Sequence, residues 1–110
     1  MDSVRVLKTE LSVTNIDEVT ENLIFKNKIS VAICNANTLV RCYKDKELND
    51  TINSFDIRCP DGFPVAKASK ILYKNNQMRV DGYKLFLQTI SQHFKIVQKQ
   101  CKKLKQIKPF

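Results

Sequence analysis

Polar side chains that could bind a ligand stand at two points where an apolar run of the sequence stops. Asn35 and Asn37 follow the run ISVAIC, residues 29–34. Asp61 follows the run FDIRC, residues 55–59, inside a Pro-Asp-Gly triplet. Amide and carboxylate groups in such loops can hydrogen-bond a ligand. They can equally close an Asx-type turn or cap the following helix, so both interpretations stay open at this point.

The elements that must position these residues alternate between strand and helix. Residues 4–13 alternate loosely between apolar and polar side chains, as in one or two short strands. Such a rhythm predicts βαβ units and a mainly parallel sheet, with the ligand site outside the carboxyl ends of the strands. The expected helices cover residues 14–27, 38–44, 47–53, 63–73 and 83–91, and the expected inner strands cover 29–34 and 55–59.

Side-chain patterns also predict which faces are buried. The continuous, β-branched run of residues 29–34 is typical of a parallel strand buried on both faces. In the helix predicted over residues 63–73, the apolar spacing places four side chains inward: Val65, Ala68, Ile71 and Leu72. In the last predicted helix, Leu85, Phe86 and Ile90 share one side.

Composition indicates one soluble, basic domain. The chain has 110 residues and a net charge of +8, with many lysines in its last third. This charge attracts nucleic acid, acidic lipid head groups or nucleotide phosphates, and does not choose among them. The lysine-rich tail, residues 93–110, is either a basic amphipathic helix that can lie on an anionic membrane, or a solvated terminal helix or tail with no partner.

Several functions are not expected from this sequence. The four cysteines form no C-x-x-C pair and His93 is the only histidine, so no metal site is expected. Residues 1–10 lack the apolar core of a secretory signal, and the cysteines are interpreted as reduced and mostly packing residues of a cytoplasmic protein. No aromatic–basic stripe or helix-turn-helix indicates nucleic-acid binding.

Three sequence blocks together resemble the WecG/TagA/CpsF glycosyltransferases, glycosyltransferase family 26, over about residues 4–92. The blocks are an Asn after the second apolar strand (Asn35), a strand with an Asp that runs into Pro-Asp-Gly (residues 56–62), and Arg-Val-x-Gly before an apolar helix (residues 79–82). Pro-Asp-Gly alone occurs in many turns. The three blocks in this order, separated by suitable helices, are much more specific.

The resemblance implies an α/β fold with a Rossmann-like sheet, no cofactor and no metal. The implied reaction transfers a hexosamine-type sugar, similar to N-acetylmannosamine, from a UDP-sugar to a lipid-linked sugar diphosphate. This reaction serves teichoic acid or cell-surface polysaccharide synthesis at the inner face of the bacterial membrane. Asp61 is the implied general base, since a sugar hydroxyl needs a carboxylate to take its proton. Substrate-binding roles are implied for Asn35, Asn37, Gly62 and Arg79.

Two departures from the family pattern affect this expectation. Lys84 stands where better-known members usually carry an acid, so the donor or acceptor can differ. The chain is also about half as long as family domains. We therefore expect the amino-terminal part of such a domain over residues 1–92, followed by the tail of residues 93–110. The alternative is a truncated, non-catalytic remnant or a subunit that pairs with a complementary chain; homo-oligomer formation is a further expectation.

Overall fold

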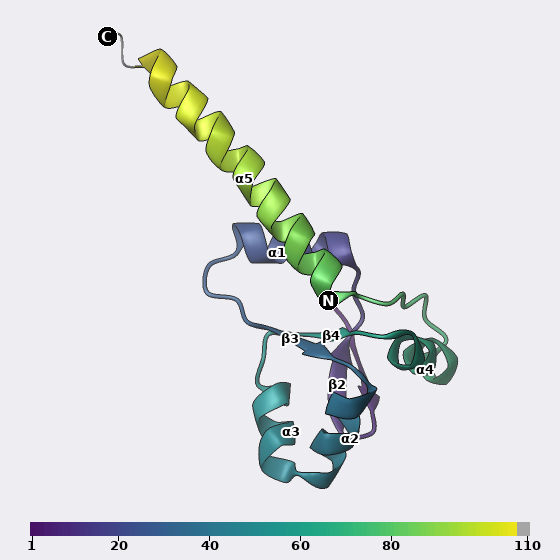
Figure 1. The fold of residues 1–110 in the computed structure, drawn as a ribbon. Helices are drawn as coiled ribbons and strands as arrows, with labels where there is room; N and C mark the ends of the chain where they lie inside the picture. The colour runs from purple at the N-terminus through teal and green to yellow at the C-terminus, as the bar shows by residue number, and fades with distance from the viewer. Residues whose placement is uncertain (108–110) are drawn as a thin grey trace.

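The computed structural model of the chain describes residues 1–107, with side chains described as far as residue 104. These residues form a mixed α/β fold, in which helices surround two small sheets (Figure 1). The elements in chain order are β1 (Ser3–Val6), β2 (Thr9–Ser12), α1 (Ile16–Phe25), β3 (Val31–Cys34), α2 (Ala36–Lys44), α3 (Lys46–Asn53), β4 (Ile57–Pro60), α4 (Phe63–Tyr73) and α5 (Gly82–Ile107).

Each sheet contains two strands. β1 and β2 form an antiparallel hairpin in which Ser3 pairs with Ser12, which confirms the short strands expected near the start of the chain. β3 and β4 are parallel, and their register runs from Val31 opposite Ile57 to Cys34 opposite Pro60. The expected parallel sheet is therefore present as a parallel pair, with the hairpin as a separate sheet.

The hairpin is tied to the parallel pair through Arg58 of β4. The backbone N–H of Arg58 donates to Ser12 Oγ at 3.0 Å, and its guanidinium donates to the carbonyl oxygens of Glu10 and Phe55. These bonds fix β2 beside β4. The hairpin thereby extends the layer formed by β3 and β4 on the β4 side.

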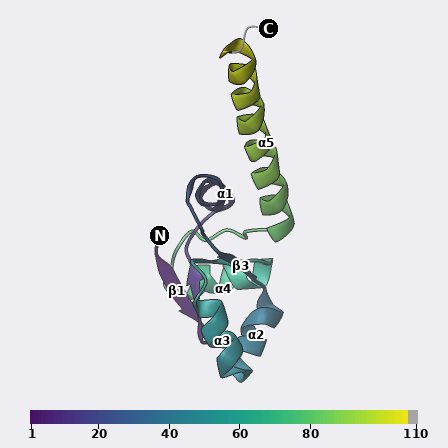
Figure 2. The ribbon, with the colours of Figure 1, turned by 90° about the vertical axis from the view of Figure 1, so that its left-hand side faces the viewer.

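Two hydrophobic clusters cover the two faces of the parallel pair. Figures 1 and 2 show α1 and α5 on one side of β3 and β4, and α2 and α3 on the other. Period-2 alternation along the strands assigns their side chains to these two clusters. The first cluster contains Val6, Leu11, Ala32, Cys34, Leu39 and Val65. The second contains Val19, Ile57, Cys59, Val80 and Leu85.

Two predictions of burial are wrong. β3 is not buried on both faces, because the Ile33 side chain, on the side of α1 and α5, is 36% exposed. In α4, Ile71 and Leu72 are exposed, while Val65 and its neighbour Ala66 are buried together with Ser69. In both places the apolar pattern continues over a surface that no element among residues 1–107 covers.

Helix α5 is much longer than predicted. The expected end near residue 91 is replaced by a continuous helix to Ile107, which projects beyond the rest of the chain (Figure 1). No glycine or proline occurs between Gly82 and Pro109, so nothing in the sequence breaks the helix earlier. The tail predicted over 93–110 is therefore helical as far as 107, and its last three residues lie outside the described part. No helix in residues 1–107 is both long and apolar enough for a membrane crossing.

Candidate active site

Three helices begin where the parallel strands end. α2 follows β3, α4 follows β4, and the segment before α5 returns to the same edge. The backbone N–H of Val80 donates to the Pro60 carbonyl at 2.9 Å, and the N–H of Asp61 donates to the Cys34 carbonyl at 2.9 Å. These two bonds bring the residues around 61 and 80 to the carboxyl edge of the parallel pair, where α/β proteins place ligand sites.

Asp61 does not cap the helix that follows it. Gly62 is the N-cap residue of α4, with φ of 94°, and no side chain makes a capping hydrogen bond there. The Asp61 side chain is 23% exposed, and its Oδ1 lies 3.7 Å from Arg79 Nε. This separation exceeds hydrogen-bond range, so the carboxylate and the guanidinium both retain the capacity to contact a third group.

Arg79 is held between two carboxylates at this edge. Its terminal nitrogen donates to Asp81 Oδ2 at 3.0 Å, and its side chain remains 52% exposed. Asp81 in turn accepts from the backbone N–H groups of Tyr83, at 2.9 Å, and Lys84, at 3.3 Å. The Lys84 and Tyr83 bonds and the Arg79 charge hold the pKa of Asp81 below its usual value. Arg79 is thus oriented by Asp81 while part of its fork faces solvent.

The structure brings Asp61, Gly62 and Arg79 together, and Asn35 directly follows Cys34, whose carbonyl accepts from the Asp61 N–H. The Asn35 Oδ1 caps α2 by accepting from the backbone N–H and the hydroxyl of Thr38, at 2.9 and 3.0 Å. Its amide nitrogen takes no part in that cap. Asn37 is exposed in the first turn of α2, and within residues 1–107 it makes no hydrogen bond to Asp61 or Arg79.

The Arg-Val-x-Gly block of residues 79–82 includes Asp81 and Gly82, but sequence reasoning assigned neither of them a role at this edge. A Cβ atom at Gly82 would lie 3.2 Å from Ile33 Cγ2 and 3.7 Å from Asp61 Oδ2. The glycine therefore permits α5 to begin directly against β3 and the Asp61 carboxylate. The signal was present in the sequence, because aspartate is a preferred N-cap residue. The Asp81 side chain accepts from the backbone N–H groups of Tyr83 and Lys84, two and three residues further along the chain.

Two buried cysteines, Cys34 and Cys59, stand near the carboxyl ends of β3 and β4. Burial, followed by the neighbouring Cys34 and the Asp61 charge, raises the pKa of the Cys59 thiol to about 12. Burial, followed by the nearby Cys42, raises the pKa of Cys34 to about 11. These thiols stay protonated at neutral pH and act as packing groups, as expected. Among the described residues, no cluster of three potential metal ligands occurs.

A mostly apolar hollow of about 520 Å³ adjoins Arg79, between α4 and residues 77–79. Apolar side chains of Phe63, Ile71 and Met78 line it, together with the cationic Lys67 and Arg79. The Lys67 ammonium also lies 5.7 Å from the centre of the Phe63 ring. An apolar hollow with cationic edges, directly beside the Asp61–Arg79 pair, suits an amphiphilic anion.

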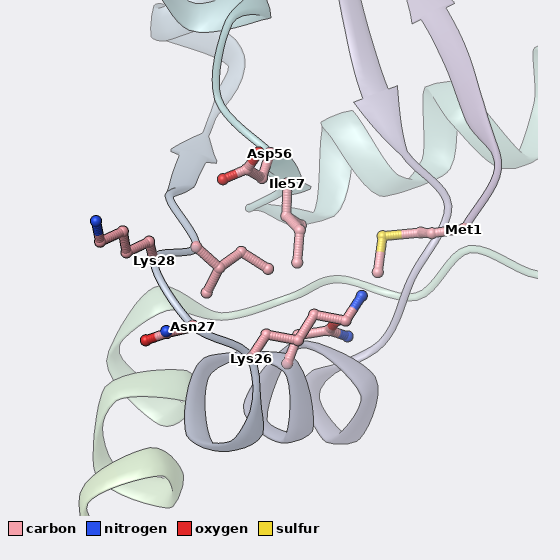
Figure 3. A pocket seen from close by; sticks show the side chains of 8 residues that line it. Met1, Lys26, Asn27, Lys28, Asp56 and Ile57 are labelled. Carbon is pink, nitrogen blue, oxygen red and sulfur yellow. The ribbon is translucent and has the colours of Figure 1, made fainter.

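A second hollow, of about 280 Å³, lies at the opposite, amino ends of the strands (Figure 3). Lys26, Lys28 and Asp56 are among its lining residues. Asp56 accepts from the backbone N–H of Ser30 at 2.8 Å and from its hydroxyl at 3.0 Å, and these bonds lower the pKa of Asp56. Its carboxylate therefore closes the loop before β3 and is not grouped with the site at the carboxyl edge.

The fold and the site define an α/β protein whose candidate site combines a carboxylate, a guanidinium and three helix starts at the carboxyl edge of parallel strands. The model of the glycosyl transferase WecG/TagA/CpsF family matches residues 4–99 of the chain. The chain belongs to this family of glycosyltransferases. A comparison with curated proteins found no match.

Proposed function

We propose that the chain transfers a hexosamine-type sugar, similar to N-acetylmannosamine, from a UDP-sugar to a lipid-linked sugar diphosphate. The family match supports glycosyl transfer in general. The observation that carries the finer proposal is the Asp61 carboxylate, which is partly exposed, unused by a helix cap, and beside Arg79. The work would take place at the cytoplasmic face of the membrane, in cell-surface polysaccharide or teichoic acid synthesis.

In the proposed reaction, Asp61 acts as the general base. It takes the proton of the acceptor hydroxyl while that oxygen bonds to the anomeric carbon of the donor sugar. The bond between the anomeric carbon and the diphosphate oxygen breaks, and UDP leaves with the bonding electron pair. No metal or other cofactor is required in this scheme.

Arg79 and the helix starts would bind the anionic groups. A guanidinium matches phosphate oxygens in fork geometry, and the first N–H groups of a helix favour negative charge. Gly62 adds no side chain at the start of α4, so the diphosphate can approach the backbone closely. Asn35 and Asn37, at the start of α2, would hold the hydroxyl or acetamido groups of a sugar.

A transfer assay with matched variants tests this proposal. UDP release is measured with a UDP-N-acetylhexosamine and a prenyl-diphosphate-linked sugar. Asp61→Asn should lower the rate by about 10²–10⁴-fold. Arg79→Gln should lower it by about 10–150-fold, the equivalent of one charged hydrogen bond. Asp50→Asn, on the exposed face of α3, is the matched control and should leave the rate unchanged. Equal rates for Asp61→Asn and Asp50→Asn would refute the assignment of the base.

The second candidate function is a subunit that needs a complementary chain. Within residues 1–107, β3 has a partner strand only on its β4 side, and the apolar Ile33 is partly exposed beside that free edge. An open, apolar edge favours the addition of another strand. On this reading the purified 110-residue chain has little or no transferase activity by itself. Turnover of a UDP-sugar by the chain alone would exclude it.

A further inference from the structure

Helix α5 carries a continuous apolar stripe that the candidate active site does not use. Its members are separated alternately by four and three residues: Tyr83, Leu87, Ile90, Phe94, Val97, Cys101 and Leu104. We call this set the α5 seam. Alternation of this kind is the a/d pattern of a heptad repeat, which keeps one narrow face of a helix apolar over several turns.

Most of the seam faces away from α1, although Ile90 also lines a hollow together with Leu23 and Ile33. Leu85 is buried in the second hydrophobic cluster, and Gln88 Nε2 donates to Asp17 Oδ1 of α1 at 2.8 Å and to Thr20 Oγ1 at 3.2 Å. At about 100° per residue, these α1-facing positions lie on the opposite side of α5 from the seam. A partner helix can therefore lie along the seam without displacing α1.

The seam is uncovered along its whole described length. Its six aromatic and aliphatic members are between 39% and 72% exposed, and Cys101 is exposed as well. The second half of α5 extends beyond the other elements in both views (Figures 1 and 2). A shallow hollow of about 300 Å³ lies against Phe94, Val97 and Cys101. A contiguous exposed apolar patch of this kind marks an interaction surface.

The charges on α5 fit a second copy of the same helix. The seam is flanked from residue 91 to residue 100 by uncharged side chains at its edge positions: Ser91, His93, Gln98 and Gln100. Lys95, Lys99 and Lys102 lie outside these edges, on the side away from the seam. Between residues 91 and 100, two seams can therefore meet without opposed lysines. The edge positions 84 and 105, outside this stretch, are lysines.

We propose that the chain self-associates through the α5 seam, as a coiled coil between copies. The a positions carry Leu87, Phe94 and Cys101, and the β-branched Ile90 and Val97 stand at two of the four d positions. β-Branched residues at d disfavour the two-stranded form, which prefers leucine there. This interaction is independent of the proposed transferase function, because none of the seam side chains is proposed to contact substrate, and Tyr83 serves the carboxyl-edge site only through its backbone N–H. The rival occupant of the seam is an anionic membrane surface. It would be attracted by the lysines of α5, which repel one another between copies of the chain, so salt should weaken membrane binding and strengthen self-association.

The test is sedimentation velocity of the full chain over a range of protein concentrations. The mass should rise with concentration above the 12.7 kDa of one chain. Phe94→Ala should weaken association by at least ~100-fold, because it removes a large side chain from a packed layer. Cys101→Leu should strengthen it by filling an a position. Lys95→Gln, one residue from Phe94 but outside the seam, is the matched control and should not weaken it.

Salt and vesicles separate the two occupants. Self-association should strengthen at high salt, because salt screens the repulsion between lysine-rich helices. Binding to vesicles with anionic lipid would instead weaken with salt. A monomer at all concentrations, an oligomer that Phe94→Ala leaves unchanged, or seam-dependent binding to vesicles without self-association would each overturn the proposal. Far-UV circular dichroism confirms that the variants keep the helix.

Discussion

The backbone at Gly62 determines where Asp61 stands, and replacing this glycine should be costly for a conformational reason alone. Gly62 has φ of 94° and ψ of 143°, a region that residues with a Cβ atom rarely occupy. There is space for a methyl group, since the nearest atom to an added Cβ would be Pro64 Cδ at 3.9 Å. Gly62→Ala should therefore destabilise the fold by about 1–3 kcal/mol through backbone strain, without a steric clash.

Urea unfolding followed by circular dichroism measures this change. Thermal unfolding gives a second measure, because for a chain of this size the melting temperature should fall by about 4–8 °C for each kcal/mol lost. The informative control is D-alanine at position 62, introduced by chemical ligation, because a D residue adopts positive φ readily and adds the same methyl group. It should restore part of the lost stability, because a D residue accepts the φ of 94° while its most populated region does not include the ψ of 143°. If L-alanine and D-alanine give equal stability, the reasoning from backbone strain is wrong.

Three further predictions concern stability and reactivity. Gln77→Leu should cost about 2–4 kcal/mol in urea unfolding, because the buried amide bonds both the N–H and the carbonyl of Thr14, at 2.9 and 2.8 Å; a loss under ~0.5 kcal/mol would contradict this. A thiol reagent should modify Cys101 first and Cys59 only after unfolding; equal rates would contradict the burial. The pKa of Asp81 is lowered in the folded state, so the stabilisation from its carboxylate is complete above the ordinary pKa of 3.8 and is lost as the pH falls through the folded pKa. Asp81→Asn should therefore flatten the acid side of the curve of unfolding free energy against pH. An unchanged curve would refute this.

Local signals in the sequence predicted most elements of the fold. The helix of residues 63–73 has the predicted bounds, because Pro-Asp-Gly stops the strand and Pro64 starts the helix. Asn15 caps α1 by accepting from the backbone N–H of Glu18, and asparagine is a residue type that favours this position. These features depend on neighbours in the chain, and a short window of sequence therefore contains them.

Tertiary features were harder to predict. The apolar spacing of Ile71 and Leu72 indicated burial, but burial depends on whether another element lies over that face. The length of α5 was underestimated because its lysines suggested a tail, although nothing between Gly82 and Pro109 ends a helix. The family blocks identified Asp61 and Arg79, but their 3.7 Å approach follows from the return of residues 79–82 to the strand ends, which no local pattern specifies.

The central claim is that substrate binds at the carboxyl edge of β3 and β4, around Asp61 and Arg79. Titration of the isotope-labelled chain with UDP and with a UDP-N-acetylhexosamine, followed by amide NMR shifts, tests it most directly. Binding at the carboxyl edge should give saturable shifts in residues 35–38, 61–63 and 79–84, and none around Lys28 and Asp56 at the opposite end of the strands. Shifts confined to the hollow at that opposite end, or no saturable shifts at the carboxyl edge, would contradict it.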